Sequence, residues 1–336
     1  MSMPMLLIRG TFRAKGTQPD GDTLSFTPDD VADWKRVPGA RPVVPGAFGN
    51  ASIRLESVDA LETHYGDKKS PSGVQHQPLE LAHAAADALL KAVGFTDFHR
   101  VGDKPAGGGG TGTGGGSGGG PGSGTGSGAG SGSGAGGTTR DDAEKITSTI
   151  PETVQGWILT RGADVFGRCV ALVGTGLPPA FNGYEVDVDD KVLEKTVNYQ
   201  LIKDGLVYPT YYSGFSEVLR ASLSAAAAEA REAEKGVWKE DRTLKGAEVV
   251  ALRSLTDDNG AVILPKLFRR LKDYLDLEPR NPSLACFRAY LAGAWEDRFY
   301  IQGRPGVFNG MHHVVEVDGQ VVKMTHGPTE IVFVEK

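Results

Sequence analysis

Apolar and polar residues alternate in five stretches of the chain. These stretches cover residues 6–13, 22–27, 51–58, 154–161 and 168–174. Because side chains along a strand point alternately to its two faces, this pattern predicts five strands that each turn one face toward a core. Apolar residues at helical spacing predict helices over residues 79–93, 192–203 and 217–235.

A glycine-rich stretch separates these elements into two groups. Residues 107–137 consist of Gly, Ser, Thr and Ala with a single proline, a composition that predicts a flexible coil. Three strands and one helix precede it, and neither group could build a complete core alone. We therefore predict a β-barrel with helices, an α+β fold. Its five-stranded barrel of the oligonucleotide-binding type and its three helices are interrupted by a flexible insertion at residues 105–139, a length that loop-closure entropy tolerates.

The predicted barrel unit ends near residue 241, and residues 242–336 show a different pattern. Helical spacing occurs at 263–277 and 283–299, and strand patterns occur at 312–322 and 331–336. These patterns predict a small C-terminal α+β domain of unknown function. The basic run FRRLK, residues 268–272, is interpreted as a solvated helix face, with nucleic-acid contact as the alternative. His312 and His313 are predicted to lie in a strand, where neighbours point to opposite faces and cannot easily share one metal ion.

Composition narrows the possible function classes. The chain has 336 residues and is 39% hydrophobic, which is ordinary for a globular protein. It contains neither an apolar run of roughly 18 residues nor a secretory signal pattern, so we expect a cytoplasmic protein without membrane spans. The net charge of −6 argues against a broad basic face, so any polyanion should be bound by a local cationic site.

Four short motifs follow one another in a characteristic order. They are DGDT at residues 20–23, RLxxVDxxET at 54–63, DxFGR at 164–168 and KGVWKED at 235–241. Together they make the chain resemble the staphylococcal nuclease (thermonuclease) family over about residues 6–241, without the insertion. The resemblance implies a calcium-dependent endonuclease that hydrolyses phosphodiester bonds of DNA and RNA with little base specificity, and that prefers single strands.

The resemblance also implies a role for individual residues. Asp22, Asp59 and the carbonyl group of Ala60 would bind Ca²⁺, Arg54 and Arg168 would hold the scissile phosphate, Glu62 would be the general base, and Tyr211 would bind the nucleotide. Where the family often reads D-T-P-E-T, this chain reads D-A-L-E-T. Leu61 therefore removes the backbone restriction that a proline imposes next to Glu62.

The chemistry of phosphodiester cleavage asks for these residue types independently. Carboxylate and carbonyl oxygens hold a hard cation, and a guanidinium presents a planar fork to two phosphate oxygens. A carboxylate can take a proton from the attacking water. Each residue taken singly could instead be a turn former or a rim salt bridge. The alternative function is a non-catalytic barrel module that binds nucleic acid or protein.

Overall fold

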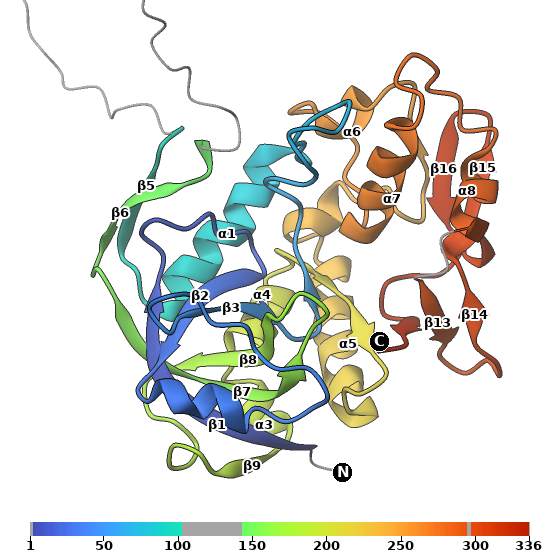
Figure 1. Ribbon diagram of the computed structural model, residues 1–336. Coiled ribbons are helices and arrows are strands. Elements are labelled where there is room, and N and C mark those ends of the chain that lie inside the picture. Colours follow the sequence, from blue (N-terminus) through green and yellow to red (C-terminus); the bar gives the residue numbers. More distant parts are fainter. Residues whose placement is uncertain (1–2, 103–142, 294–296, 336) are drawn as a thin grey trace, which may run out of the picture.

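A computed structural model of the chain describes residues 3–102, 143–293 and 297–335 (Figure 1). The predicted insertion at residues 105–139 lies outside the described residues.

Five strands form a closed barrel, as predicted. They are β1 (Met3–Arg13), β2 (Thr23–Pro28), β3 (Ala51–Leu55), β7 (Val154–Ala163) and β8 (Cys169–Thr175). The order around the ring is β1, β2, β3, β8, β7 and back to β1. β9 (Glu185–Val188) pairs with the N-terminal residues of β1, Met3 to Leu6. All pairs are antiparallel except β3 with β8. This arrangement is consistent with a barrel of the oligonucleotide-binding type.

The barrel unites segments that are far apart in the sequence. β1 pairs with β7 from Leu6 to Phe12, although the undescribed residues 103–142 lie between the two strands in the sequence. In β2 and β3 every second side chain is buried, which is the alternation that the sequence predicted. A single interior therefore forms from strands on both sides of the insertion.

Helices pack against several parts of the barrel (Figure 1). The α-helices of this region are α1 (Leu79–Val93), α3 (Asp190–Leu193), α4 (Val197–Lys203) and α5 (Glu217–Glu232), and the 3-10 helices are η1 (Val31–Arg36) and η2 (Gly236–Lys239). α1 has the predicted bounds and ends at Gly94, whose φ of 112° suits a glycine C-cap. The predicted helix at 192–203 is instead split, because the Thr196 side chain caps a new helix by accepting from the backbone N–H of Tyr199.

The remaining strands and helices are short. Two small sheets pair β4 (Val58–Asp59) with β10 (Tyr208–Pro209) and β5 (Asp97–Arg100) with β6 (Ile146–Ile150). The C-terminal part contains α6 (Arg253–Thr256), α7 (Pro265–Leu275), α8 (Phe287–Gly293), η3 (Met311–His313), β12 (Ala247–Glu248), β13 (Arg298–Ile301), β14 (Phe308–Asn309), β15 (Val315–Asp318), β16 (Val321–Met324) and β17 (Ile331–Phe333).

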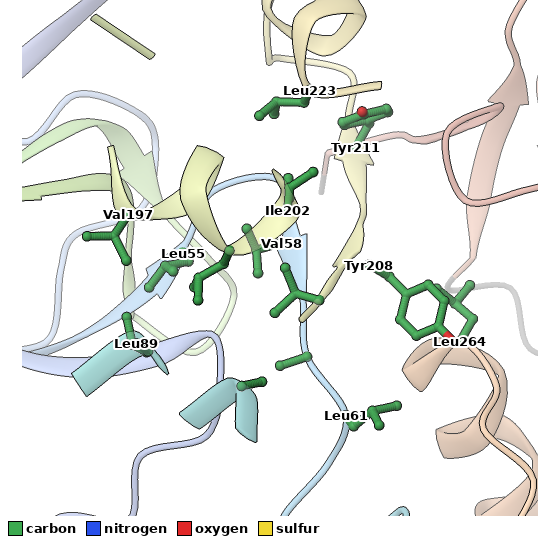
Figure 2. Packing of buried hydrophobic residues seen from close by; sticks show 14 of the residues in the cluster. Leu55, Val58, Leu61, Leu89, Val197, Ile202, Tyr208, Tyr211, Leu223 and Leu264 are labelled. Atoms are coloured by element: carbon green, nitrogen blue, oxygen red, sulfur yellow. The ribbon is translucent and has the colours of Figure 1, made fainter. Parts of the chain in front are cut away.

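The C-terminal part packs directly against the part that precedes it. β17 pairs in parallel with β11 (Tyr211–Tyr212), so the last strand of the chain extends a sheet that begins before residue 242. In the core, Leu55 and Val58 lie among Leu89 of α1 and Ile202 of α4, and Leu264 at the start of α7 lies beside Tyr208 (Figure 2). Apolar packing is thus continuous from the barrel to α7.

Two of the elements predicted for the C-terminal part are wrong. His312 and His313 lie in the 3-10 helix η3, and their ring centroids are 4.0 Å apart instead of on opposite faces. Gly310, with a φ of 89°, turns the chain into η3 just before them, so the strand begins only at Val315. The second predicted helix, 283–299, is also too long, because Arg298 already begins β13. Among the described residues, no helix is long and apolar enough to cross a membrane.

Candidate active site at the barrel rim

The candidate site lies where β2 begins and β3 ends. Thr23 pairs with Arg54 in the antiparallel β2–β3 ladder, so Asp22 lies beside the end of β3, and its carbonyl accepts from the N–H of Leu55 at 2.8 Å. Ser57, with a φ of 62°, turns the chain from β3 into β4. β4 then pairs with β10 and fixes Asp59 opposite Tyr208. Local pairing therefore brings three charged positions of two sequence motifs to one rim.

Arg54 joins the two aspartates of the predicted metal site. Its Nη2 donates to Asp59 Oδ1 at 2.9 Å, and its Nη1 pairs with Asp22 Oδ2. The backbone N–H of Ala60 donates to the same Asp22 oxygen at 2.9 Å. Asp59 is completely buried and Asp22 nearly so. The structure thus brings Asp22, Arg54, Asp59 and Ala60 together, and both carboxylates bind the guanidinium of Arg54.

A second guanidinium, which the sequence analysis did not identify, completes the cluster. Arg269 of α7 donates from Nη1 and Nη2 to both oxygens of Asp59 at 3.1 to 3.3 Å, and its Nη1 also binds Glu62 Oε1. The Arg269 side chain is only 23% exposed. The interpretation of FRRLK as a solvated face is therefore wrong, because buried carboxylates from the barrel rim bind its first arginine.

Further contacts attach α7 to the loop that follows β4. Two hydrogen bonds join the loop to α7 itself: Tyr65 Oη donates to Asp273 Oδ2 and Lys272 Nζ donates to Ser70 Oγ, both at 2.9 Å. Two more join it to residues that flank the helix: the N–H of Ser72 donates to Asp276 Oδ1 at 3.1 Å, and Gln77 Nε2 donates to the carbonyl of Ile263 at 2.8 Å. These bonds span residues 65 to 77, so the docking of α7 extends well beyond Arg269. No pattern in the sequence pairs this helix with that loop.

The pKa values of Asp59 and Glu62 shift in opposite directions. Burial acts to raise the pKa of Asp59, but the positive charges of Arg269 and Arg54 outweigh it and hold the pKa below its ordinary value. Burial raises the pKa of Glu62, and the nearby negative charges of Asp20 and Asp59 add to this effect, although Arg269 opposes it. At neutral pH the site therefore holds a firmly ionised aspartate beside a more basic glutamate.

Arg168 lies on the neighbouring strand and has its own partner. In the parallel β3–β8 ladder the buried Ile53 pairs with the buried Cys169. Arg168 comes just before Cys169 and Arg54 just after Ile53. Because neighbouring residues of a strand point to opposite faces, both arginines lie on the outer face of the barrel. Arg168 Nε donates to Asp164 Oδ2 at 2.7 Å within its own turn. Its side chain is 33% exposed, and neither of its terminal nitrogens donates to any of the described residues. These nitrogens are available to a ligand.

Tyr211 is not brought to this cluster. The residue is fully buried, and its hydroxyl group is hydrogen-bonded to Ser224 Oγ at 2.8 Å and to the carbonyl of Arg220 at 3.1 Å, both in α5. Its backbone pairs with Val332 of β17. Tyr211 therefore connects α5 with the C-terminal strand instead of facing the barrel rim.

The donor atoms at the rim fit calcium in their chemistry. The carboxylates of Asp22 and Asp59 lie close enough to share the guanidinium of Arg54. Carboxylate and carbonyl oxygens are the ligands that Ca²⁺ takes in proteins. In the present arrangement, however, arginine nitrogens bind both Asp59 oxygens and one oxygen of Asp22. Within the described ranges, no group of three or more His, Cys, Asp or Glu side chains is arranged to hold a metal ion. Calcium could bind Asp59 here only in exchange for a guanidinium.

Comparison with known proteins adds no family to this description. The chain matches no protein-family model, and a search of the curated proteins finds no match. The function must therefore be argued from the site.

Proposed function

We propose that the chain is a calcium-dependent nuclease that hydrolyses phosphodiester bonds of DNA or RNA, preferably single-stranded, with little base specificity. The observation that carries this proposal is the bridging of Asp22 and Asp59 by Arg54 at the barrel rim, with Glu62 in the same cluster. A pair of acidic groups, a guanidinium and a further carboxylate are the chemical groups that phosphodiester hydrolysis needs.

The two arginines of the motifs would bind the phosphate. Arg54 and Arg168 lie on the same outer face of neighbouring strands, and the terminal nitrogens of Arg168 have no acceptor among the described residues. A guanidinium can donate two parallel hydrogen bonds to phosphate oxygens and neutralise the charge that develops on them. Arg168 would therefore contact the substrate first. Arg54 would bind the same phosphate after releasing one of its two carboxylate partners, Asp22 or Asp59.

Glu62 would act as the general base. Its raised pKa makes its carboxylate a stronger proton acceptor than an ordinary glutamate, which suits removal of a proton from water at neutral pH. Asp22, Asp59 and the carbonyl group of Ala60 would hold Ca²⁺. When bound, the ion would supply positive charge next to the phosphate oxygens.

The fold assignment is part of the same proposal. We take residues 1–241 as a nuclease-like unit with a barrel of the oligonucleotide-binding type and three helices, α1, α4 and α5, interrupted by the insertion at 105–139. Residues 242–336 are taken as a C-terminal α+β unit. The pairing of β17 with β11 and the contacts of α7 attach this unit to residues that precede 242.

A second candidate function follows from Arg269. Because this residue binds Asp59 and Glu62, the retained carboxylates could serve only to dock α7. The chain would then be a non-catalytic barrel module that binds nucleic acid or protein. In this case the cluster is a structural ion-pair network.

Digestion of single-stranded DNA by the purified full-length chain separates the two functions. We expect degradation with calcium, none after a chelator is added, and recovery when calcium is restored in excess. Glu62→Gln, purified in parallel, controls for a contaminating nuclease, since a contaminant would digest DNA in both preparations. A chain that binds single-stranded DNA but leaves it intact at every calcium concentration would establish the binding module instead.

A further inference from the structure

Arg269 and calcium require the same carboxylate oxygens. Both oxygens of Asp59 accept from Arg269, and one of them also accepts from Arg54. The same guanidinium binds Glu62 Oε1. A metal ion at Asp59 and the side chain of Arg269 in its present position are therefore mutually exclusive.

We propose that Arg269 is an internal competitor of calcium, so that the site stays in an autoinhibited form until the Arg269 guanidinium withdraws. The inference rests on the proposed function, because it concerns the same carboxylates. Arg269 gives Asp59 and Glu62 a positive partner without providing the divalent charge that catalysis would use. Removal of the guanidinium would leave the Asp59 oxygens to the ion.

The contacts around Arg269 fit a part that docks and undocks. Besides Arg269, α7 meets the loop after β4 through polar groups, among them Tyr65 Oη with Asp273 and Lys272 Nζ with Ser70 Oγ, and through the ring of Phe268, whose centroid lies 6.3 Å from that of Tyr65. Water can replace the partners of the polar groups when they separate, whereas the buried Leu267, Phe268 and Leu271 hold the helix on the core, so it is the Arg269 side chain and the polar edge of α7 that can leave the rim. Each docking bond should therefore lower the share of molecules that can bind calcium.

Calcium titration of the full-length chain by calorimetry tests the competition with three variants. Arg269→Gln removes the competing charge and should bind calcium roughly tenfold to a thousandfold more tightly than the wild type, as expected when the competent state is a minor one. Tyr65→Phe keeps Arg269 and every charge but loses one docking hydrogen bond, and should bind calcium about fivefold more tightly.

Arg270→Gln is the matched control. Arg270 is the next residue of α7 and is similarly buried, but its Nε donates to Asp297 Oδ2 at 2.7 Å instead of to the rim. This variant removes the same charge from the same helix and should leave calcium affinity within about twofold of the wild type. A gain equal to that of Arg269→Gln would mean that lost positive charge alone explains the effect, and would overturn the competition.

The outcomes separate this inference from the proposed function. Unchanged calcium affinity in both Arg269→Gln and Tyr65→Phe, or no calcium binding by any variant, overturns the competition. If Arg269→Gln does not fold, Tyr65→Phe decides alone. Tighter calcium binding without digestion of single-stranded DNA supports the competition and refutes the nuclease. Digestion of single-stranded DNA, with the calcium affinity of Arg269→Gln and Tyr65→Phe equal to that of the wild type, supports the nuclease and refutes the competition.

Discussion

Arg269 and Asp59, which are 210 residues apart in the sequence, form an ion pair in which both terminal nitrogens of the guanidinium donate to the buried carboxylate. The pair places a residue of the C-terminal part at the centre of the candidate site. It also means that α7 helps to set the charge balance of the barrel rim. The Asp59 carboxylate therefore links the barrel strand that carries Arg54 to the helix of the C-terminal part that carries Arg269.

Removal of this pair should destabilise the protein. Arg269→Gln leaves Asp59 and Glu62 buried with less compensation, and we expect the free energy of unfolding without calcium to fall by about 3 to 5 kcal/mol. Urea unfolding measures this. Arg9→Gln is the control, because Arg9 is 51% exposed and 4.0 Å from Asp29, so its loss should cost less than about 1 kcal/mol. Equal losses in the two variants would show that the Arg269 pair contributes no more than a surface pair.

Glu62→Gln should reduce catalysis without weakening the metal site. The amide keeps the shape of the side chain but cannot accept a proton as the carboxylate does, so turnover should fall by roughly 10²–10⁴-fold. Asp22→Asn should instead weaken calcium binding, and raising calcium should recover part of its activity. Steady-state rates over a calcium series compare the two. If Glu62→Gln turns over like the wild type, the general base must be another group.

Arg168→Lys should lower the rate at saturating calcium. Lysine keeps the charge but cannot form the two parallel bonds of a guanidinium, so we expect roughly a tenfold to hundredfold loss in kcat/KM. Asp164 should still bind the lysine within the turn, which leaves stability nearly unchanged. Kinetics and thermal unfolding should be measured on the same preparation. A wild-type rate would remove Arg168 from the phosphate site.

Glu56 should make stability depend on pH. Burial raises the pKa of this carboxyl group above its ordinary value of 4.5, with Arg161 opposing and Glu335 adding to the shift. Between 4.5 and the raised pKa the folded state keeps a proton that the unfolded state has lost, so stability falls as pH rises through this window, by at most about 1.4 kcal/mol per pH unit.

Glu56→Gln cannot titrate and isolates this contribution. Urea unfolding of both proteins from about pH 4 to about pH 8 should show the wild type losing stability relative to the variant as pH rises. A difference that stays constant, or a wild type that gains stability relative to the variant as pH rises, would contradict the raised pKa.

Tyr211→Phe should affect stability but not the binding of nucleic acid. The change removes the hydrogen bonds of the hydroxyl group to α5, at a cost of about 1 kcal/mol, and leaves the aromatic ring in the core. Binding of single-stranded DNA, measured by fluorescence anisotropy, should match the wild type. Weaker binding at unchanged stability would restore the role in nucleotide binding that the resemblance implied.

The sequence by itself determined the elements that depend on local patterns. The alternation in residues 22–27 and 51–58 identified β2 and β3, because a barrel strand must turn every second side chain inward. The spacing in residues 79–93 identified α1 to the residue, since Gly94 supplies a local stop signal. The motifs around Asp22, Arg54 and Asp59 could also be located, because their order along the chain resembles that of a known family, and strand pairing then places the start of β2 beside the end of β3.

The tertiary structure alone decided which partners these residues meet. Arg269 looked like a solvated helix charge because a lysine- and arginine-rich helix has the same local pattern whether it faces water or buried carboxylates. Tyr211 was assigned to the nucleotide by the resemblance alone, whereas its burial depends on α5 and on a strand more than a hundred residues further along. Periodicity reports which face of an element is apolar, whereas charge pairing depends on how separate elements pack, and no local pattern records that packing.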